Sequence, residues 1–78
     1  MKFCERLAIK RKELNLNKKE VAKMMGLGPM YYARFENGQL LPTKANAQMF
    51  SDFLGIEKDE LIDLLEKEKE FYRKNNAL

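Results

Sequence analysis

The sequence contains no histidine and no tryptophan, and it has a single cysteine, Cys4. Without histidine, the chain lacks the commonest metal ligand and the commonest general base of enzymes. A zinc site built from cysteine and histidine within this chain is therefore excluded. One cysteine cannot form an internal disulfide, which fits a reducing cytosol, and a small buried apolar residue is the simplest interpretation of Cys4.

Other common features of enzymes and membrane proteins are also missing. Gly26 and Gly28 do not form a phosphate-binding loop, because Pro29 follows at once and has no N–H to donate. The longest stretch without a charged residue, 24–33, is too short to span a bilayer, and no secretion signal is visible. We therefore expect a cytoplasmic protein that is not an enzyme and has no cofactor, metal, membrane contact or small-molecule ligand.

The charge is unevenly divided along the 78 residues, whose net charge is +3. Residues 1–50 hold ten Lys or Arg against four acids, and residues 51–78 hold five against eight, so the two parts carry +6 and −3. A basic first part favours an anionic partner such as nucleic acid. A merely soluble surface of mixed charge gives the same totals, so charge alone leaves this choice open.

The residue pattern predicts helices throughout and disfavours a β fold. β-Branched residues are few, with one valine, one threonine and three isoleucines, and no long stretch alternates between polar and apolar residues. We expect one domain over 1–73 and a frayed tail over 74–78. Turn and capping residues divide that domain into five helices, at about 2–14, 18–25, 29–37, 44–54 and from 57 or 58 onward.

Apolar residues at helical spacing indicate which side of each of these helices faces the core. The third helix has a large aromatic pair on one side, whereas the others carry smaller apolar stripes. The expected inward residues of the first four helices are Phe3, Leu7 and Leu14, then Val21, Ala22 and Met25, then Tyr32 and Phe35, and finally Ala47, Phe50 and Leu54.

Capping residues predict a sharp bend between the second and third helices. Asn17 is a good N-cap for the second helix, because Glu20 three residues later completes a capping box. Gly26 can end that helix with a positive φ. Gly28 can then cap the third helix with Pro29 as its first residue, where the missing N–H costs nothing. The sequence therefore predicts a helix–turn–helix unit.

The outer face of the third helix suits the major groove of DNA. At ~100° per residue, one side of the helix carries no acid and lies opposite the aromatic pair. An arginine on this side can hydrogen-bond bidentately to guanine, and apolar atoms can contact a thymine methyl group. The residues of this side are Met30, Ala33, Arg34 and Asn37.

Glu36 falls on the inward side of the third helix, where a carboxylate without a partner would be costly. The first helix offers Arg11, whose planar guanidinium suits a bidentate, partly buried ion pair. The alternative is a solvent-exposed Glu36 that contributes nothing to stability.

These features together resemble the phage repressor/Cro-type helix-turn-helix family of DNA-binding regulators (XRE-like) over about residues 6–62. The matching pieces are Arg11, "LNKKEVAKMMGLG", "FENG", Pro42-Thr43, "LGI" and "DEL" in that order. The resemblance implies an all-α, five-helix, phage-repressor-like helix-turn-helix domain. Here its C-terminal helix is extended beyond what the minimal domain needs.

The resemblance also implies that the third helix reads DNA and that the flanking segments contact phosphates. Tyr31 can donate to a phosphate or be merely exposed, Met30 can be a simple exposed flank, and the lysines can form a solvated face. Lys18 stands where the family usually has glutamine. We assign base reading to Pro29, Met30, Ala33 and Arg34, and backbone contacts to Lys18, Lys19, Tyr31, Asn37, Gln39 and Lys44.

The leading hypothesis is a sequence-specific regulator of transcription that binds double-stranded DNA, and we expect a repressor of phage or mobile-element type. The alternative is a protein-interaction module with the same fold. A third hypothesis, an RNA-associated factor, is weaker because only Tyr31 could offer an exposed aromatic platform.

The last helix has a wide apolar arc, which favours a homodimer on an inverted-repeat operator. Half-sites about one helical turn apart would suit such a dimer. The alternative is that this helix covers only the core of its own monomer. The candidate dimer residues are Leu61, Leu64, Leu65, Phe71 and Tyr72.

Overall fold

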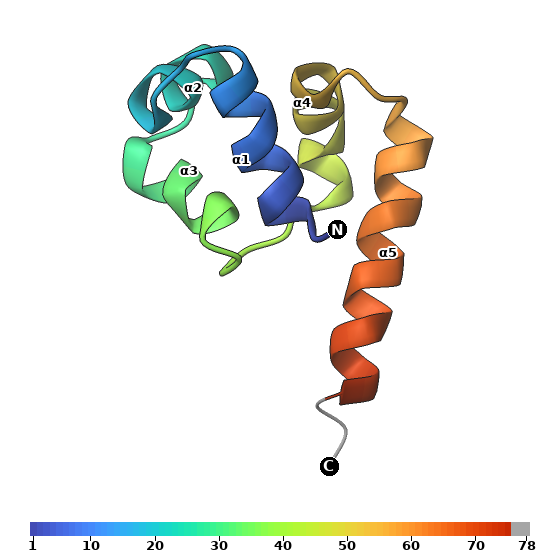
Figure 1. Ribbon diagram of the computed structural model, residues 1–78. Helices are drawn as coiled ribbons and strands as arrows, with labels where there is room; N and C mark the ends of the chain where they lie inside the picture. Colours follow the sequence, from blue (N-terminus) through green and yellow to red (C-terminus); the bar gives the residue numbers. More distant parts are fainter. Residues whose placement is uncertain (76–78) are drawn as a thin grey trace. The chain divides into compact units, whose positions relative to one another are not determined.

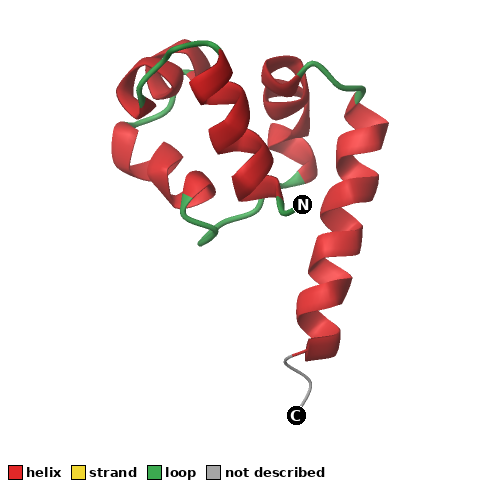
Figure 2. Ribbon diagram, viewed as in Figure 1, coloured by secondary structure: helices red, strands yellow, loops and turns green. Residues whose placement is uncertain are grey.

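The computed structural model describes residues 1–75 of the chain. These residues form helices and loops without a strand (Figure 2). The helices are α1 (Phe3–Glu13), α2 (Lys18–Met25), α3 (Pro29–Glu36), α4 (Lys44–Leu54) and α5 (Lys58–Asn75). The all-α, five-helix prediction is confirmed for the described residues.

The expected frayed tail over 74–78 stays a prediction. Lys74 and Asn75 belong to α5, because the sequence from Lys58 onward holds strong helix formers without glycine or proline. The remainder of the predicted tail, 76–78, lies outside the described residues.

The chain divides into two compact units, Met1–Leu41 and Pro42–Leu78. In the first unit, coloured blue to green in Figure 1, α3 packs against both α1 and α2. In the second unit α4 packs against α5. The expectation of a single domain over 1–73 stays a prediction.

The core of the first unit comes from all three of its helices. The side chains of Phe3, Leu7, Val21, Ala22, Tyr32 and Phe35 are at most 3% exposed. Leu14, which we expected on the inward face, is 46% exposed. The reason is local: α1 ends at Glu13, and Asn15 turns the chain with a left-handed φ of 57°.

The bend between α2 and α3 has the capping chemistry that the sequence predicts. The Glu20 N–H donates to Asn17 Oδ1 at 2.8 Å, and the Asn17 N–H donates to Glu20 Oε1 at 2.9 Å. Gly26 ends α2 with a φ of 71°, a conformation that favours glycine. Gly28 is the N-cap of α3 and Pro29 its first residue.

In the second unit, α4 and the first part of α5 share a core. Ala47, Phe50, Leu61 and Leu65 are at most 4% exposed. Buried Ser51 donates its hydroxyl proton to the Gln48 carbonyl at 2.9 Å. None of the residues 66–74 is buried, and Figure 1 shows this later part of α5 continuing beyond α4.

None of the helices within residues 1–75 combines the length and apolar character that a membrane-crossing helix needs.

Candidate nucleic-acid interface

The orientation of α3 is fixed by its two inward aromatic residues. Tyr32 is fully buried and Phe35 is 2% exposed. Met30, Arg34 and Asn37 lie exposed on the other side, with Met30 at 84% exposure. We name the residues Met30, Ala33, Arg34 and Asn37 the outer face of α3; only Ala33 is partly covered.

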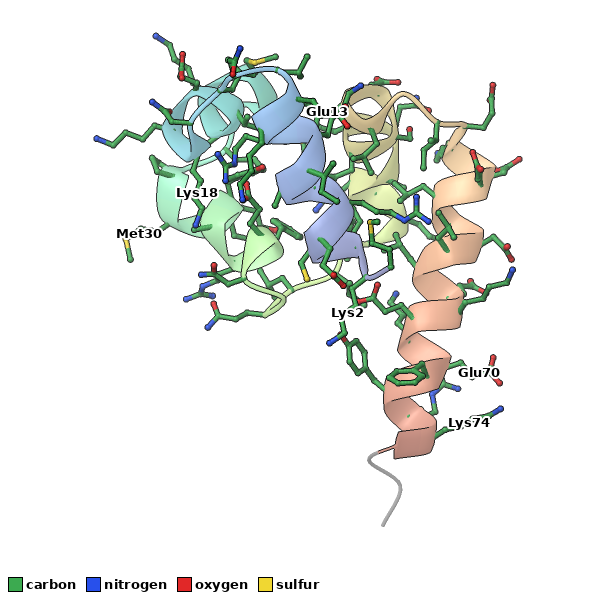
Figure 3. The ribbon with its side chains drawn as sticks, in the orientation of Figure 1. Lys2, Glu13, Lys18, Met30, Glu70 and Lys74 are labelled. Carbon is green, nitrogen blue, oxygen red and sulfur yellow. The ribbon has the colours of Figure 1, made fainter. Side chains whose placement is uncertain are left out.

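The start of α3 offers little hydrogen-bonding capacity from side chains. Its N-cap, Gly28, has an extended backbone and makes no side-chain cap. Pro29 follows at the first helical position and has no N–H. Met30 comes next, and its side chain extends away from the ribbon in Figure 3.

Tyr31 lies at the edge of the outer face and remains 42% exposed. Its ring packs edge-to-face on Phe35, with centroids 5.1 Å apart and planes at 83°. Such a contact with a core residue restrains the ring while the residue stays accessible. The position of the Tyr31 ring is therefore restrained by Phe35, although the residue is exposed at the surface.

Arg11 and Glu36 form a bidentate ion pair between α1 and the end of α3. Arg11 Nε donates to Glu36 Oε2 at 2.8 Å, and Arg11 Nη2 donates to Glu36 Oε1 at 2.9 Å. The Glu36 side chain is 3% exposed and that of Arg11 13%. Arg11 Nη1 also donates to the Leu16 carbonyl at 3.0 Å, which ties the pair to the turn before α2.

The charge of Glu36 is balanced within the first unit. Burial is the largest influence and opposes ionisation, yet the hydrogen bonds and positive charge of Arg11 and the neighbouring Tyr32 hydroxyl together act against it, and the pKa of the Glu36 carboxyl is lowered. The positive charge of Lys18 lowers the same pKa further. Glu36 therefore stays ionised and turned inward, and it leaves the outer face of α3 without an acid.

The Tyr32 hydroxyl is buried beside this pair. It makes no hydrogen bond of good geometry with the described residues. Burial and the neighbouring Glu36 carboxylate both raise the pKa of Tyr32 far above its usual value. Tyr32 is therefore a neutral core residue and not a surface donor.

Five of the six proposed backbone-contact residues lie in the first unit, on α2, on α3 or in the loop after α3. Lys18 and Lys19 are exposed at the start of α2, and Asn37 and Gln39 are exposed in the loop after α3. The Gln39 N–H donates to the Arg34 carbonyl at 2.9 Å, so this loop stays close to the end of α3. Lys44 belongs to the second unit, where it is exposed as the first residue of α4.

The dimer candidates on α5 divide into two kinds. Leu61 is 1% and Leu65 4% exposed, so both are core residues of the monomer. The prediction that these two leucines contact a second copy is wrong, because both side chains are already buried within the monomer. Leu64 and Tyr72 are partly exposed and Phe71 is 57% exposed.

Two groups that interact with the Arg11–Glu36 pair were not predicted from the sequence. The Leu16 carbonyl accepts from Arg11, but a backbone acceptor in a turn gives no signal in the residue pattern. The closeness of Lys18 to Glu36 is a second omission. An inward carboxylate at the end of α3 could have prompted a search for a second cation at the start of α2.

Comparison with known proteins agrees with this geometry. The HTH_3 family, described as helix-turn-helix, matches residues 7–61. A curated relative, the cryptic phage CTXphi transcriptional repressor RstR of Vibrio cholerae serotype O1, is 39% identical over 61 residues. That alignment covers 78% of this chain and 54% of the relative, so the chain spans about half the length of the curated relative it matches. No solved structure matches significantly. Since the matched residues make up most of the chain, it belongs to the helix-turn-helix family, as its resemblance to phage repressors predicted.

Proposed function

We propose that this chain is a sequence-specific regulator that binds double-stranded DNA and represses transcription. The observation that carries the proposal is the outer face of α3, which is exposed and free of acids, whereas Glu36 is held inward by Arg11. An acid-free face with an exposed arginine suits the negative potential and guanine edges of the major groove. The similarity to a phage transcriptional repressor supports repression rather than activation. We place the activity in the cytoplasm, without a cofactor, a small-molecule ligand or an enzymatic step.

Two groups of residues divide the work of binding. Sequence-independent attraction comes from cations and hydrogen-bond donors at phosphates, and specificity comes from contacts to base edges. The proposed base readers are Pro29, Met30, Ala33 and Arg34, and the proposed backbone contacts are Lys18, Lys19, Tyr31, Asn37, Gln39 and Lys44.

We propose further that a second copy of the chain covers the later part of α5. This part has no buried residue between 66 and 74, yet it carries Phe71 at 57% exposure beside Tyr72, with ring centroids 5.9 Å apart. In a two-fold symmetric dimer, the same surface of each subunit forms the interface.

Dimerisation would also meet a need of DNA binding. One small module buries only ~600–1,000 Å² of protein surface on DNA, which gives weak binding by itself. Two modules joined by α5 would read an inverted-repeat operator with half-sites about one helical turn, ~34 Å, apart.

The test is selection of bound sequences from random duplexes, followed by titration of the selected duplex at several salt concentrations. We expect a discrete site with inverted symmetry and an affinity that falls steeply as salt rises. Binding without sequence preference would contradict the proposal. No binding to duplex DNA would favour a protein-interaction module instead.

A further inference from the structure

The outer face of α3 is poor in hydrogen-bonding groups at its leading end. Of the proposed base readers, Pro29, Met30 and Ala33 are apolar, and only Arg34 carries donors that can reach a base edge. The N-cap before them, Gly28, has no side chain. The start of α3 must therefore discriminate base pairs largely by apolar contact.

Met30 is the side chain best placed for such a contact. It is 84% exposed, the highest exposure among the large apolar residues described, and it extends away from the protein in Figure 3. Methionine is flexible and polarisable, so its thioether can adapt to an apolar surface. Ala33, one turn later, is too small to keep DNA away from Met30.

The major groove displays one apolar group for such a side chain, which is the methyl group on C5 of a pyrimidine. In ordinary DNA this group belongs to thymine, and in methylated DNA also to 5-methylcytosine. Resting on the proposed function, we propose that Met30 selects a base pair carrying this C5-methyl group, about two base pairs from the pair that Arg34 reads. Four residues rise ~6 Å along a helix, and neighbouring base pairs lie ~3.4 Å apart.

The experiment uses the whole chain and the duplex obtained by selection. Each thymine of a half-site is replaced in turn by deoxyuridine, which removes only the methyl group. At one thymine near the guanine read by Arg34, we expect about fourfold weaker binding by the natural protein, the value of one buried methyl-sized group. The Met30→Ala variant should bind the thymine and deoxyuridine duplexes equally well.

A matched control is Met24→Ala, which removes another exposed methionine, 64% exposed, from α2. This variant should keep the fourfold difference between thymine and deoxyuridine. Replacing that thymine–adenine pair by cytosine–guanine, with and without the cytosine C5-methyl group, distinguishes the two methyl sources. Tighter binding to the methylated cytosine shows that Met30 senses the methyl group in either base, and equal binding to both cytosines restricts the site to thymine.

The outcomes separate this inference from the function on which it rests. If the natural protein selects a duplex but no thymine shows a methyl effect that Met30→Ala abolishes, the Met30 assignment is wrong and the proposed function stands. If Met24→Ala abolishes the effect as well, the assignment to Met30 is also overturned. If the natural protein selects no duplex, both the proposed function and this inference fail.

Discussion

Arg11 on α1 donates two hydrogen bonds, of 2.8 and 2.9 Å, to the Glu36 carboxylate at the last turn of α3. The two residues are 25 positions apart in the chain, so the pair fixes the packing of α3 on α1. The same guanidinium holds the Leu16 carbonyl in the turn that leads to α2. One arginine thus joins all three helices of the first unit.

Replacing Glu36 with alanine should destabilise the protein strongly. Removing one partner of a buried pair leaves the other charge uncompensated, at a cost of ~3–5 kcal/mol. The Arg11 side chain is 13% exposed and keeps some access to water, so we expect the lower end, about 3 kcal/mol. Thermal unfolding should show a melting temperature lower by roughly 10 °C or more.

The control for this variant is Glu13→Ala, which removes an exposed carboxylate at the end of α1. Surface substitutions of this kind change stability by at most ~0.5 kcal/mol. If the Glu36→Ala and Glu13→Ala proteins had the same melting temperature, the Arg11–Glu36 pair would contribute nothing to the stability of the fold.

The stability that the Arg11–Glu36 pair contributes should be lost at low pH. The pKa of Glu36 is lower in the folded protein than in the unfolded chain, so its stabilising effect is complete above the unfolded value of ~4.3. The effect is lost as the pH falls through the lower, folded-state pKa. In urea unfolding at pH 7, 5, 4 and 3, the stability gap between the natural protein and Glu36→Gln should narrow only below about pH 4. A gap that stayed constant down to pH 3 would contradict this linkage.

The sequence predicted the first unit well because its signals are local. Asn17, Glu20 and Gly26 act within one turn of their own positions, and the structure has each of them in the expected role. The partner of Glu36 was also predictable, since a helical periodicity turned a carboxylate inward and Arg11 was the cation with a suitable shape. The base-contact and phosphate-contact assignments stay predictions.

The sequence predicted α5 less well, because its periodicity shows which side is apolar but not how far along the helix a neighbour reaches. Leu61 and Leu65 lie opposite α4 and are buried, whereas Phe71 lies beyond the buried part of the same helix. The chain reverses after Gly55, so the extent of burial along α5 depends on where α4 begins, and Lys44 at that start lies near Leu65 and Lys69. The pattern of α5 alone does not hold that information.

Arg34→Ala should relax base preference at one base pair in each half-site. The exposed guanidinium on the outer face of α3 can donate two hydrogen bonds to a guanine, a contact worth ~1–3 kcal/mol of discrimination. Affinity of the variant should be measured for duplexes with all four base pairs at each position. Lys12→Ala removes a positive charge from an exposed site at the end of α1 and should keep the preference. If the Arg34→Ala protein keeps the same base preference, residues other than Arg34 read the bases.

Lys18→Ala should weaken binding to every duplex by a similar factor. Lys18 is exposed at the start of α2, where a cation is unfavourable for the helix dipole, so a role at phosphate gives a reason for its presence. Losing one phosphate contact should reduce the slope of log affinity against log salt by about one unit. Lys12→Ala, an exposed lysine at the end of α1, is the charge-matched control. A loss confined to one base sequence would argue against a phosphate contact for Lys18.

Phe71→Ser should shift the protein from dimer to monomer without unfolding it. Phe71 is 57% exposed in the monomer, so its replacement removes little of the monomer's own packing but takes an aromatic anchor from the proposed interface. Leu65→Glu cannot serve this purpose, because Leu65 is 4% exposed and a buried charge there would unfold the second unit. Sedimentation equilibrium should show a dimer dissociation constant at least tenfold higher for Phe71→Ser, with an unchanged melting temperature at low concentration. Ile9→Ser, which alters another exposed apolar residue at 44% exposure on α1, should leave the dimer intact. A natural protein that stayed monomeric, both alone and on a selected site without inverted symmetry, would rule out a dimer formed through α5.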